Sequence, residues 1–532
     1  MSAGPKPLWW QAGTIYQIYP HSFQDSNGDG VGDLTGIIDR LDYLVWLGVD
    51  AIWLSPVYPS PMADFGYDVS DYVGIDPLFG SLDDFSRLVD EAHGRGLKVI
   101  MDYVPNHTSE AHPWFVESRA ARTSAKRDWY IWRDEAPGGG PPNNWLSEFG
   151  GPAWTRDEAT GQYYYHAYLP QQPDLNWRNA DVRAAMHEVL HTWFKRGVDG
   201  FRIDTVHHLF EEPGLTDNPP NPDFKPGMAP TLALDRKNQY DQPEVHDALQ
   251  EFRTIADGYG ARVLIGEIYL PLERIVTYYG TDLSGVHLPF NFHLIGAKWQ
   301  AKTVAELITR YEALLPAGAW PNWVLGNHDR ARVASRIGTE AARVAAMLLL
   351  TLRGTPTLYY GDEIGMTDGV IPPARVQDPW EKRVPGFGFG RDPVRTPMAW
   401  TAEPHGGFSV ADPWLPLHDT RQCNVAAQQS DSGSMLMLTR ALIALRRQEP
   451  ALSIGAYGLI EARGDVLVYE RHHRGRRLAV LLNFADSTVY TPLAGAGTRL
   501  LSTHPGPASE HAGPLVRLRP REGIVLEVSR QA

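Results

Sequence analysis

The sequence predicts an α/β protein: a (β/α)8 TIM barrel with a subdomain inserted after the third strand and a C-terminal antiparallel β domain. Eight short runs rich in Val, Ile, Leu, Phe and Tyr alternate with helical patterns before residue 362. Such alternation is typical of the βα units that build a parallel sheet. A long insertion interrupts it once, and after residue 450 it gives way to short strands without helices.

The eight strand candidates are short and apolar, as strands buried on both faces of a parallel sheet must be. They occupy residues 14–20, 51–56, 98–104, 200–204, 263–267, 287–292, 322–327 and 355–361. Apolar residues three and four apart predict helices at 34–48, 81–96, 180–197 and 244–260. The run at 344–352 is too short for a membrane helix and indicates a buried one.

Two irregular segments are expected at the barrel mouth. Residues 105–173, rich in Trp, Pro, Gly and Asn, predict an inserted subdomain between the third and fourth strands. Residues 362–416, dense in Gly, Pro and Arg, predict an irregular subdomain after the eighth strand. The barrel is then expected to comprise 1–104 and 174–450, and the alternating strands of 451–532 a C-terminal β-sandwich domain.

The composition restricts partners and compartment. The 532 residues carry a net charge of −14, whereas a protein that binds nucleic acid needs a basic face. The single cysteine, Cys423, permits no intramolecular disulfide, and the first 13 residues lack the apolar core of a signal peptide. We therefore expect a cytoplasmic protein without nucleic-acid or membrane partners. The sequence does not decide between a monomer and a homo-oligomer.

The segment DSNGDGVGD, at 25–33, has the spacing of a loop that binds a hard cation. Side-chain oxygens stand at loop positions 1, 3, 5 and 9, a backbone carbonyl is available at position 7, and Gly30 permits the turn. The predicted ligands are Asp25, Asn27, Asp29, Val31 (through its carbonyl) and Asp33. Oxygen ligands favour Ca²⁺ or Mg²⁺ in a structural role, and no organic cofactor is expected. The alternative is an Asx-rich turn without metal.

Three carboxylates follow predicted strands, where the C-terminal tips of barrel strands carry chemistry. Asp204, Glu267 and Asp329 come from three different strands, and glycoside hydrolysis needs two such groups at one mouth. Arg202 shares a strand face with Asp204 and is expected to keep it ionised. The apolar strand before Glu267 is expected to raise its pKa, as an acid/base requires. Each carboxylate taken singly is better explained as a helix cap or surface group.

The chain resembles the α-amylase superfamily through the segments DYVPNH (102–107), QPDLNW (172–177), GFRIDT (200–205), GEIYLP (266–271) and GNHD (326–329). The resemblance covers nearly the whole chain. Within the superfamily it is similar to the α-glucosidase and oligo-1,6-glucosidase branch. The segments that carry this narrower resemblance are IYQIYP with DSNGDGVGDL, MADFGYDVSDY (62–72) and GRDPVRTPMAW (390–400).

The resemblance implies a role for each matching residue. Asp204 corresponds to the nucleophile with Arg202 as its partner, Glu267 to the general acid/base, and Asp329 to a carboxylate that binds the 2- and 3-hydroxyls of the sugar. The resemblance also implies that His107 and His328 donate hydrogen bonds to the same glucose and that Tyr67 is an aromatic platform. Asp64 and Arg391 are implied to bind O4 of the terminal glucose.

Three further questions concern which arginine lies beside Asp64, whether two histidines bind a metal, and which linkage is preferred. Arg391 competes with Arg395 for the place beside Asp64, and the family pattern favours Arg391. His207 and His208 lack the carboxylate spacing of a zinc site and are interpreted as loop or pocket-wall residues. Thr205, directly after the nucleophile, resembles enzymes that act on α-1,4 rather than α-1,6 links.

The resemblance therefore implies a retaining exo-acting α-glucosidase whose substrate is a short oligosaccharide, with an α-1,4 (maltose-type) preference. A transglucosylase or isomerase acting on maltose or sucrose through the same glucosyl-enzyme is the main alternative. A non-catalytic, transporter-associated relative is a remote alternative, because such relatives lose the catalytic carboxylates that this chain retains.

Overall fold

The computed structural model describes residues 7–417, 420–421, 423–493, 495, 497–506 and 511–528. Eight parallel strands form its centre: β1 (Ile15–Ile18), β2 (Ala51–Leu54), β3 (Lys98–Tyr103), β7 (Gly200–Ile203), β8 (Val263–Gly266), β9 (Leu288–Pro289), β10 (Asn322–Val324) and β11 (Thr355–Tyr359). Their order is β10-β11-β1-β2-β3-β7-β8-β9. A parallel bridge from Asn291, just after β9, to Trp323 in β10 completes the ring. The (β/α)8 barrel is confirmed.

Alternate residues of each strand point into the barrel and out toward the helices. In β3, Ile100 belongs to an interior cluster with Trp53 of β2 and Ile265 of β8, whereas its neighbours pack outward. In β7, Phe201 and Ile203 belong to the outer core, so Arg202 between them points inward. The same alternation carries the side chain of the next inward residue, Asp204, to the barrel mouth.

The predicted helices cover the outside of the barrel. They include α4 (Leu82–Gly94), α6 (Ala180–Lys195), α7 (Val245–Asp257) and the buried α12 (Thr339–Thr351). Ser81 and Asp84 exchange side-chain and backbone hydrogen bonds at the start of α4, which is a capping box. The pattern at 34–48 forms two helices rather than one, α2 (Leu34–Asp39) and α3 (Leu41–Leu47). The chain breaks at Arg40, whose guanidinium donates to Gln24 and lies over the Trp400 ring.

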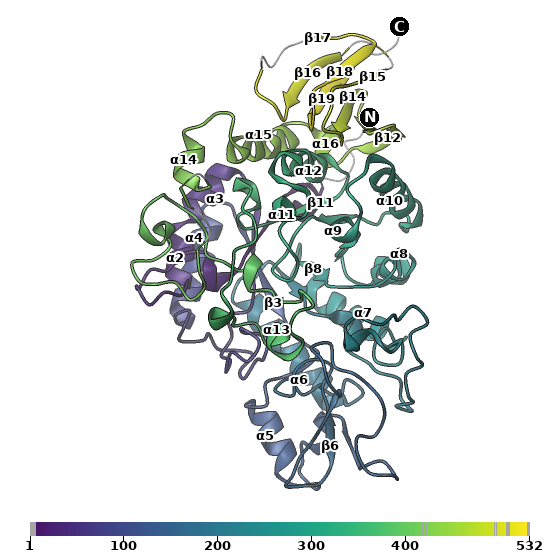
Figure 1. Cartoon of the computed structure of the whole chain (residues 1–532). Helices are drawn as coiled ribbons and strands as arrows, with labels where there is room; N and C mark the ends of the chain where they lie inside the picture. The colour runs from purple at the N-terminus through teal and green to yellow at the C-terminus, as the bar shows by residue number, and fades with distance from the viewer. Residues whose placement is uncertain are drawn as a thin grey trace.

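The segment inserted after β3 has its own aromatic core. It contains α5 (Pro113–Ala120) and a small antiparallel sheet of β4 (Trp132–Arg133), β6 (Tyr163–Tyr165) and β5 (Trp154–Arg156). Trp145 packs with Trp154 of β5 and Tyr165 of β6 in one hydrophobic cluster. In Figure 1 this segment lies at the opposite end of the barrel from the C-terminal strands. Residues 362–416 carry only short helical turns, among them α13 (Pro379–Arg383).

The C-terminal region follows α15 (Met435–Gln448) and α16 (Pro450–Ser453). A six-stranded antiparallel sheet, in the order β12-β13-β14-β19-β16-β17, contains β12 (Ala456–Arg463), β13 (Val466–His473), β14 (Arg476–Asn483), β16 (Gly497–Ser502), β17 (His511–Ala512) and β19 (Gly523–Val528). A second sheet pairs β15 (Val489–Pro492) with β18 (Leu515–Leu518). Leu481 of β14 joins the core between the two sheets, and Leu482 joins the main core on the barrel side. The C-terminal antiparallel domain is confirmed, and its limits at 451–532 stay a prediction.

Among the described residues, no helix is both long enough and apolar enough to cross a membrane.

Candidate active site

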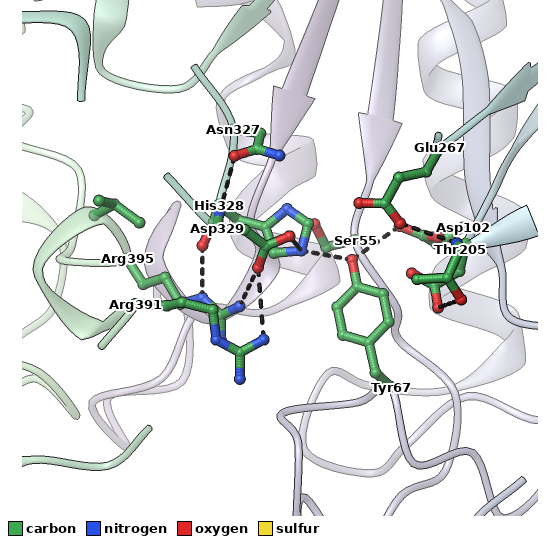
Figure 2. Close-up of polar contacts among 12 residues, drawn as sticks. Ser55, Tyr67, Asp102, Thr205, Glu267, Asn327, His328, Asp329, Arg391 and Arg395 are labelled. Atoms are coloured by element: carbon green, nitrogen blue, oxygen red, sulfur yellow. Dashed lines mark hydrogen bonds and ion pairs between the residues drawn. The ribbon is translucent and has the colours of Figure 1, made fainter. Parts of the chain in front are cut away.

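The three carboxylates predicted to be catalytic meet at the C-terminal mouth of the barrel. Asp204 directly follows β7 and Glu267 directly follows β8, and these strands pair through Ile203 and Gly266. Neighbouring strands lie about 4.8 Å apart, so the two carboxyl groups leave the sheet side by side. Asp329 approaches from the loop after β10, and Tyr67 lies between it and Glu267 in Figure 2.

Arg202 holds the carboxylates from below. Its Nη1 donates to Asp204 Oδ1 at 2.7 Å and to Asp102 Oδ1 at 2.6 Å. Its Nη2 lies 2.6 Å from Glu267 Oε2. The side chain is only 1% exposed, so it supports the carboxylates rather than facing the pocket. One planar guanidinium that contacts both Asp204 and Glu267 favours the short carboxylate separation of retaining glycosidases.

Thr205 connects the two carboxylates through an unusual backbone conformation. Its φ of +36° and ψ of +43° place a β-branched residue in the left-handed region, which is strained. In this conformation its N–H donates to Glu267 Oε2 at 2.9 Å, and its hydroxyl donates to Asp204 Oδ2 at 3.3 Å. The residue expected to influence linkage preference therefore also orients both carboxyl groups.

Asp329 lies among cations on the other side of the site. Its Oδ1 is 2.9 Å from Arg395 Nη2 and 3.5 Å from Arg391 Nη1. His328 stacks on the Tyr67 ring at 5.4 Å and contacts the Tyr67 hydroxyl through Nε2 at 2.8 Å. The Tyr67 hydroxyl in turn donates to Asp102 Oδ2 at 3.1 Å, which links the two sides of the pocket.

The Asp64–Arg391 pair forms as expected. Arg391 Nη2 lies 2.6 Å from Asp64 Oδ1, and Asp378 holds the same guanidinium at 2.7 Å. Gln172 contacts the other oxygen of Asp64 at 3.3 Å and His107 Nε2 at 3.0 Å. Arg395 is fully buried and bonds Asp329 instead, so Arg391 is the arginine beside Asp64.

These side chains line one cavity of about 230 Å³. Of the residues predicted to contact substrate, only Arg202 does not line this cavity, because it lies beneath it. The lining residues among them are Asp64, Tyr67, His107, Asp204, Thr205, Glu267, His328, Asp329 and Arg391. His207 and His208 also line the cavity, and burial lowers the pKa of each to about 3, so both are neutral. This agrees with their interpretation as pocket-wall residues.

The electrostatics separate the carboxyl groups by role. Burial raises the pKa of Glu267 to about 8 against the opposing charge of Arg202, and Asp204 and Asp329 add to the rise. Burial also raises the pKa of Asp204, to about 7, because Arg202 and its hydrogen bond do not outweigh desolvation and the nearby Asp102. The expectation that Arg202 alone keeps Asp204 ionised is thus incomplete. The group that retains a proton to the highest pH is Glu267.

The opposite shift occurs at Asp329. Burial alone would raise its pKa, but His328, Arg395 and Arg391 hold the pKa of Asp329 below its usual range. Burial lowers the pKa of His328 itself, so the two guanidinium groups supply most of the positive charge. A wide pH range therefore exists in which Glu267 is protonated and Asp329 is ionised, so the two groups suit different roles, acid and hydroxyl binding.

Several pocket residues were not predicted from the sequence. Gln172 belongs to the QPDLNW segment and Tyr269 to the GEIYLP segment, so their motifs were visible although their roles were not. Trp380 comes from the short helix α13, and the others come from loops without periodic patterns: Glu148, Phe149, Tyr168, Arg236, Tyr240 and Arg330. Phe149 belongs to the inserted segment and lies 4.8 Å from the Arg391 guanidinium. The inserted segment and residues 362–416 thus both contribute to the mouth.

The predicted cation loop lies after β1, apart from this cavity. Asp25 is buried and accepts from the N–H groups of Asn27, Gly28 and Gly30, and Asp33 caps α2 through the Gly36 N–H. Asn27 and Asp29 are exposed. Among the described residues, no three His, Cys, Asp or Glu side chains are gathered closely enough to form a metal site.

Comparison with known proteins agrees with this architecture. Residues 17–455 match the family described as the catalytic domain of alpha-amylase, and residues 455–525 match a domain of unknown function, DUF3459. A probable alpha-glucosidase of Rhizobium meliloti (strain 1021) is 42% identical over 91% of this chain and 90% of its own length. Three bacterial oligo-1,6-glucosidases are 36–39% identical, over 90% of this chain and 90–93% of theirs.

Two solved structures are similar to this chain over nearly its whole length. The alpha-glucosyl transfer enzyme XgtA superposes with a TM-score of 0.93 at 40% identity, over 98% of this chain and all of that one. The trehalulose synthase MutB from Pseudomonas mesoacidophila MX-45 superposes with a TM-score of 0.90 at 33% identity, over 99% of this chain and all of that one. The barrel, the carboxylates at its mouth and these matches together show that the chain belongs to the alpha-amylase family of glycoside hydrolases.

Proposed function

We propose that this protein is a retaining, exo-acting α-glucosidase that releases α-glucose from the non-reducing end of short α-glucosides, with a preference for α-1,4 links. One observation carries the proposal: Asp204 and Glu267 emerge from adjacent strands and contact one guanidinium group, that of Arg202. A nucleophile and an acid placed this closely match the double-displacement geometry. The relatives named alpha-glucosidase support the substrate class.

The reaction follows from the hydrogen bonds of Glu267. Its Oε2 accepts from the Thr205 N–H and contacts Arg202, so the proton belongs on Oε1. Glu267 donates that proton to the glycosidic oxygen while Asp204 attacks the anomeric carbon and forms a glucosyl ester. Glu267, now a carboxylate, takes a proton from water that cleaves the ester. Two inversions leave the α configuration unchanged.

The exo-acting mode is supported by the closed end of the cavity. The buried ion pair of Asp64 and Arg391 offers donors and acceptors for the terminal hydroxyls, and Asp378 and Gln172 fix the pair. A cavity of about 230 Å³ with such an end favours one terminal sugar ring over a continuous chain. His107, His328 and Asp329 line the same cavity and complete the proposed hydroxyl contacts.

The α-1,4 preference rests on Thr205. Its side chain lines the pocket beside both carboxylates, which is consistent with an influence on how the leaving sugar approaches. The test is a panel of maltose, isomaltose, sucrose and maltodextrins, with products separated by chromatography and the first anomer identified by NMR. We expect glucose from maltose, and we expect the glucose cleaved from methyl α-glucoside, whose leaving group is not a sugar, to appear first as the α anomer. Initial β-glucose from that glucoside, or internal cleavage of maltodextrins without glucose, contradicts the proposal.

A transglucosylase or isomerase is the second candidate. The structural similarity to XgtA, named an alpha-glucosyl transfer enzyme, and to a trehalulose synthase favours it, because both would use a glucosyl-enzyme at the same carboxylates. A dominant disaccharide or transfer product from concentrated maltose or sucrose would identify this activity. The complete set of three carboxylates argues against the non-catalytic alternative.

We further propose that Asp25, Asn27, Asp29, Asp33 and the Val31 carbonyl hold a structural Ca²⁺ or Mg²⁺. Three carboxylates stand in this nine-residue loop, and none of them forms an ion pair with a described Lys, Arg or His. Such a cation would balance their charge and stabilise the loop after β1.

A cytoplasmic location is supported by the single cysteine and is testable by cell fractionation.

A further inference from the structure

A buried glutamine of β1 contacts one of the pocket histidines. Gln17 is fully buried, and its neighbours Tyr16 and Ile18 pack into the outer core, so its side chain points into the barrel. There its amide Nε2 lies 2.8 Å from His328 Nδ1 and 3.3 Å from Ser55 Oγ. Gln17 does not line the catalytic pocket, so it can act on a sugar only through its neighbours.

The groups on the other side of the ring determine where His328 carries its proton. Burial lowers the pKa of His328 well below its usual value, so the ring is neutral and has one N–H. Its Nε2 lies 2.8 Å from the Tyr67 hydroxyl and 3.4 Å from Asp329 Oδ2 (Figure 2). Asp329, held as an anion by Arg391 and Arg395, can only accept a hydrogen bond. The proton of the ring therefore belongs on Nε2.

The Tyr67 hydroxyl leads to the same assignment. Burial raises the pKa of Tyr67, so it keeps its one proton, and it donates that proton to Asp102 Oδ2 at 3.1 Å. Arg202 Nη1 contacts the other oxygen of Asp102 at 2.6 Å. Burial raises the pKa of Asp102 to about 7 against the charge of Arg202, so Asp102 is an acceptor above that pH. The Tyr67 oxygen can then accept a hydrogen bond from the Nε2–H of His328.

With its proton on Nε2, the His328 ring presents a lone pair at Nδ1 that needs a donor. The amide of Gln17 has a nitrogen on one side and an oxygen on the other, and only the nitrogen can donate to Nδ1. The hydrogen bonds then run in one direction, from Gln17 through His328 and Tyr67 to Asp102. An oxygen at the same place would draw the proton to Nδ1 and turn Nε2 into an acceptor.

We propose that Gln17 is a positioning residue that keeps His328 in the tautomer able to donate to a sugar hydroxyl. The proposal rests on the function proposed above, in which His328 contacts the terminal glucose. In this tautomer the N–H lies on the side of the ring that carries the contacts with Tyr67 and Asp329, which also line the pocket.

The first test identifies the protonated nitrogen. In protein labelled with ¹⁵N-histidine, at a pH above the pKa of Asp102, long-range ¹H–¹⁵N correlations distinguish the two tautomers of a neutral ring. The spectrum of His328→Phe assigns the His328 signals. We expect the proton on Nε2 in the wild type. A proton on Nδ1 overturns the proposal.

The second test is a kinetic cycle of Gln17→Met and His328→Phe. Met keeps the length of glutamine without its N–H, and Phe keeps the stacking on Tyr67 without a ring nitrogen. We expect Gln17→Met to lower kcat/KM about tenfold in the wild type and less than about twofold in His328→Phe, because a residue that acts through His328 loses its effect without it. The substrate is p-nitrophenyl α-glucoside, so that slow variants stay measurable.

The matched control removes an amide elsewhere. Gln428 belongs to α14 (Val425–Gln429), is partly buried, and donates to the Ile364 carbonyl at 2.7 Å. It does not line the pocket, so we expect Gln428→Met to leave kcat/KM within about twofold in both backgrounds.

The outcomes separate this proposal from the glucosidase assignment. Equal losses from Gln17→Met in the two backgrounds overturn the proposal, because Gln17 would then act on the fold rather than through His328. If Gln17→Met does not fold, the tautomer of the wild type still decides. A proton on Nδ1 in a protein that hydrolyses maltose removes the role of Gln17 and leaves the glucosidase assignment standing. A protein inert toward every α-glucoside removes both.

Discussion

Two acidic regions of the molecule share a residue type and differ in chemistry. At the barrel mouth, Asp102, Asp204 and Glu267 are buried and Asp329 is partly buried, and the four share the guanidinium groups of Arg202, Arg391 and Arg395. In the loop after β1, Asp25, Asp29 and Asp33 have no such partner among the described residues, and backbone N–H groups satisfy Asp25 and Asp33. At the mouth, arginines and burial move the pKa values of the carboxyl groups apart, whereas in the loop backbone N–H groups hold the carboxylates in place.

The comparison shows why only one region is suited to acid–base work. At the mouth, burial raises the pKa of Glu267 to about 8, and two arginines hold that of Asp329 below its usual range. Two carboxyl groups with pKa values pushed in opposite directions can act as acid and anion at one pH.

Removing one catalytic carboxyl should have the largest effect. Asp204→Asn and Glu267→Gln keep the shape of the side chain but remove the nucleophile or the acid, so we expect kcat/KM for maltose to fall at least about 10³-fold. The measurement is initial glucose release, with circular dichroism to verify folding. Asp90→Asn, at an exposed aspartate of α4, is the control and should retain activity. Activity near wild type in Asp204→Asn would show that Asp204 is not the nucleophile. The carboxylates at the mouth would then no longer differ from those of the loop by a role in catalysis.

The Asp64–Arg391 pair should show the next largest effect. Asp64→Asn replaces the charged partner of Arg391 at the closed end of the cavity with a neutral amide, so we expect about a 100-fold lower kcat/KM for maltose, equivalent to about 2.7 kcal/mol. Arg391→Lys keeps the charge but cannot reproduce two-sided contacts with Asp64 and Asp378. Both variants should also lose selectivity for terminal glucose in maltodextrin digests. Unchanged product patterns would show that the pair is only structural.

The pH profile should show the elevated pKa of Glu267. The protonated form is the active acid, so the raised pKa extends activity upward, and kcat/KM should fall about tenfold per unit above pH 8. On the acid side, kcat/KM should fall as the carboxylate of Asp204 gains a proton. A full pH profile with maltose measures both limbs. A descending alkaline limb centred near pH 5, the range of an ordinary glutamate, would contradict the effect of burial.

The sequence predicted the barrel and its carboxylates because their signals are local. Each strand is an apolar run, and Asp204 and Glu267 directly follow such runs. Phe149 and Trp380 were missed because they reach the pocket from irregular segments, where no periodicity indicates which side chain faces inward. The left-handed conformation of Thr205 could not be predicted, because local preference opposes it in a β-branched residue. Tertiary contacts around the carboxylates determine it.

The cation loop should show the smallest effect on catalysis and a clear effect on stability. If Ca²⁺ or Mg²⁺ binds, chelation with EDTA or the substitution Asp25→Asn should lower Tm by about 5 °C, because a ligand that binds only the folded state stabilises it. Activity at 25 °C should stay within about twofold, since the loop does not line the catalytic cavity.

Elemental analysis of the purified protein and recovery of Tm on adding back each cation separate binding from a simple change of side chain. A protein without metal, and with a Tm that EDTA does not alter, would favour the Asx-rich turn. In that case the N–H groups that surround Asp25 would be sufficient to hold the loop. The loop would then differ more from the barrel mouth, because its carboxylates would be held by backbone N–H groups without an arginine or a cation.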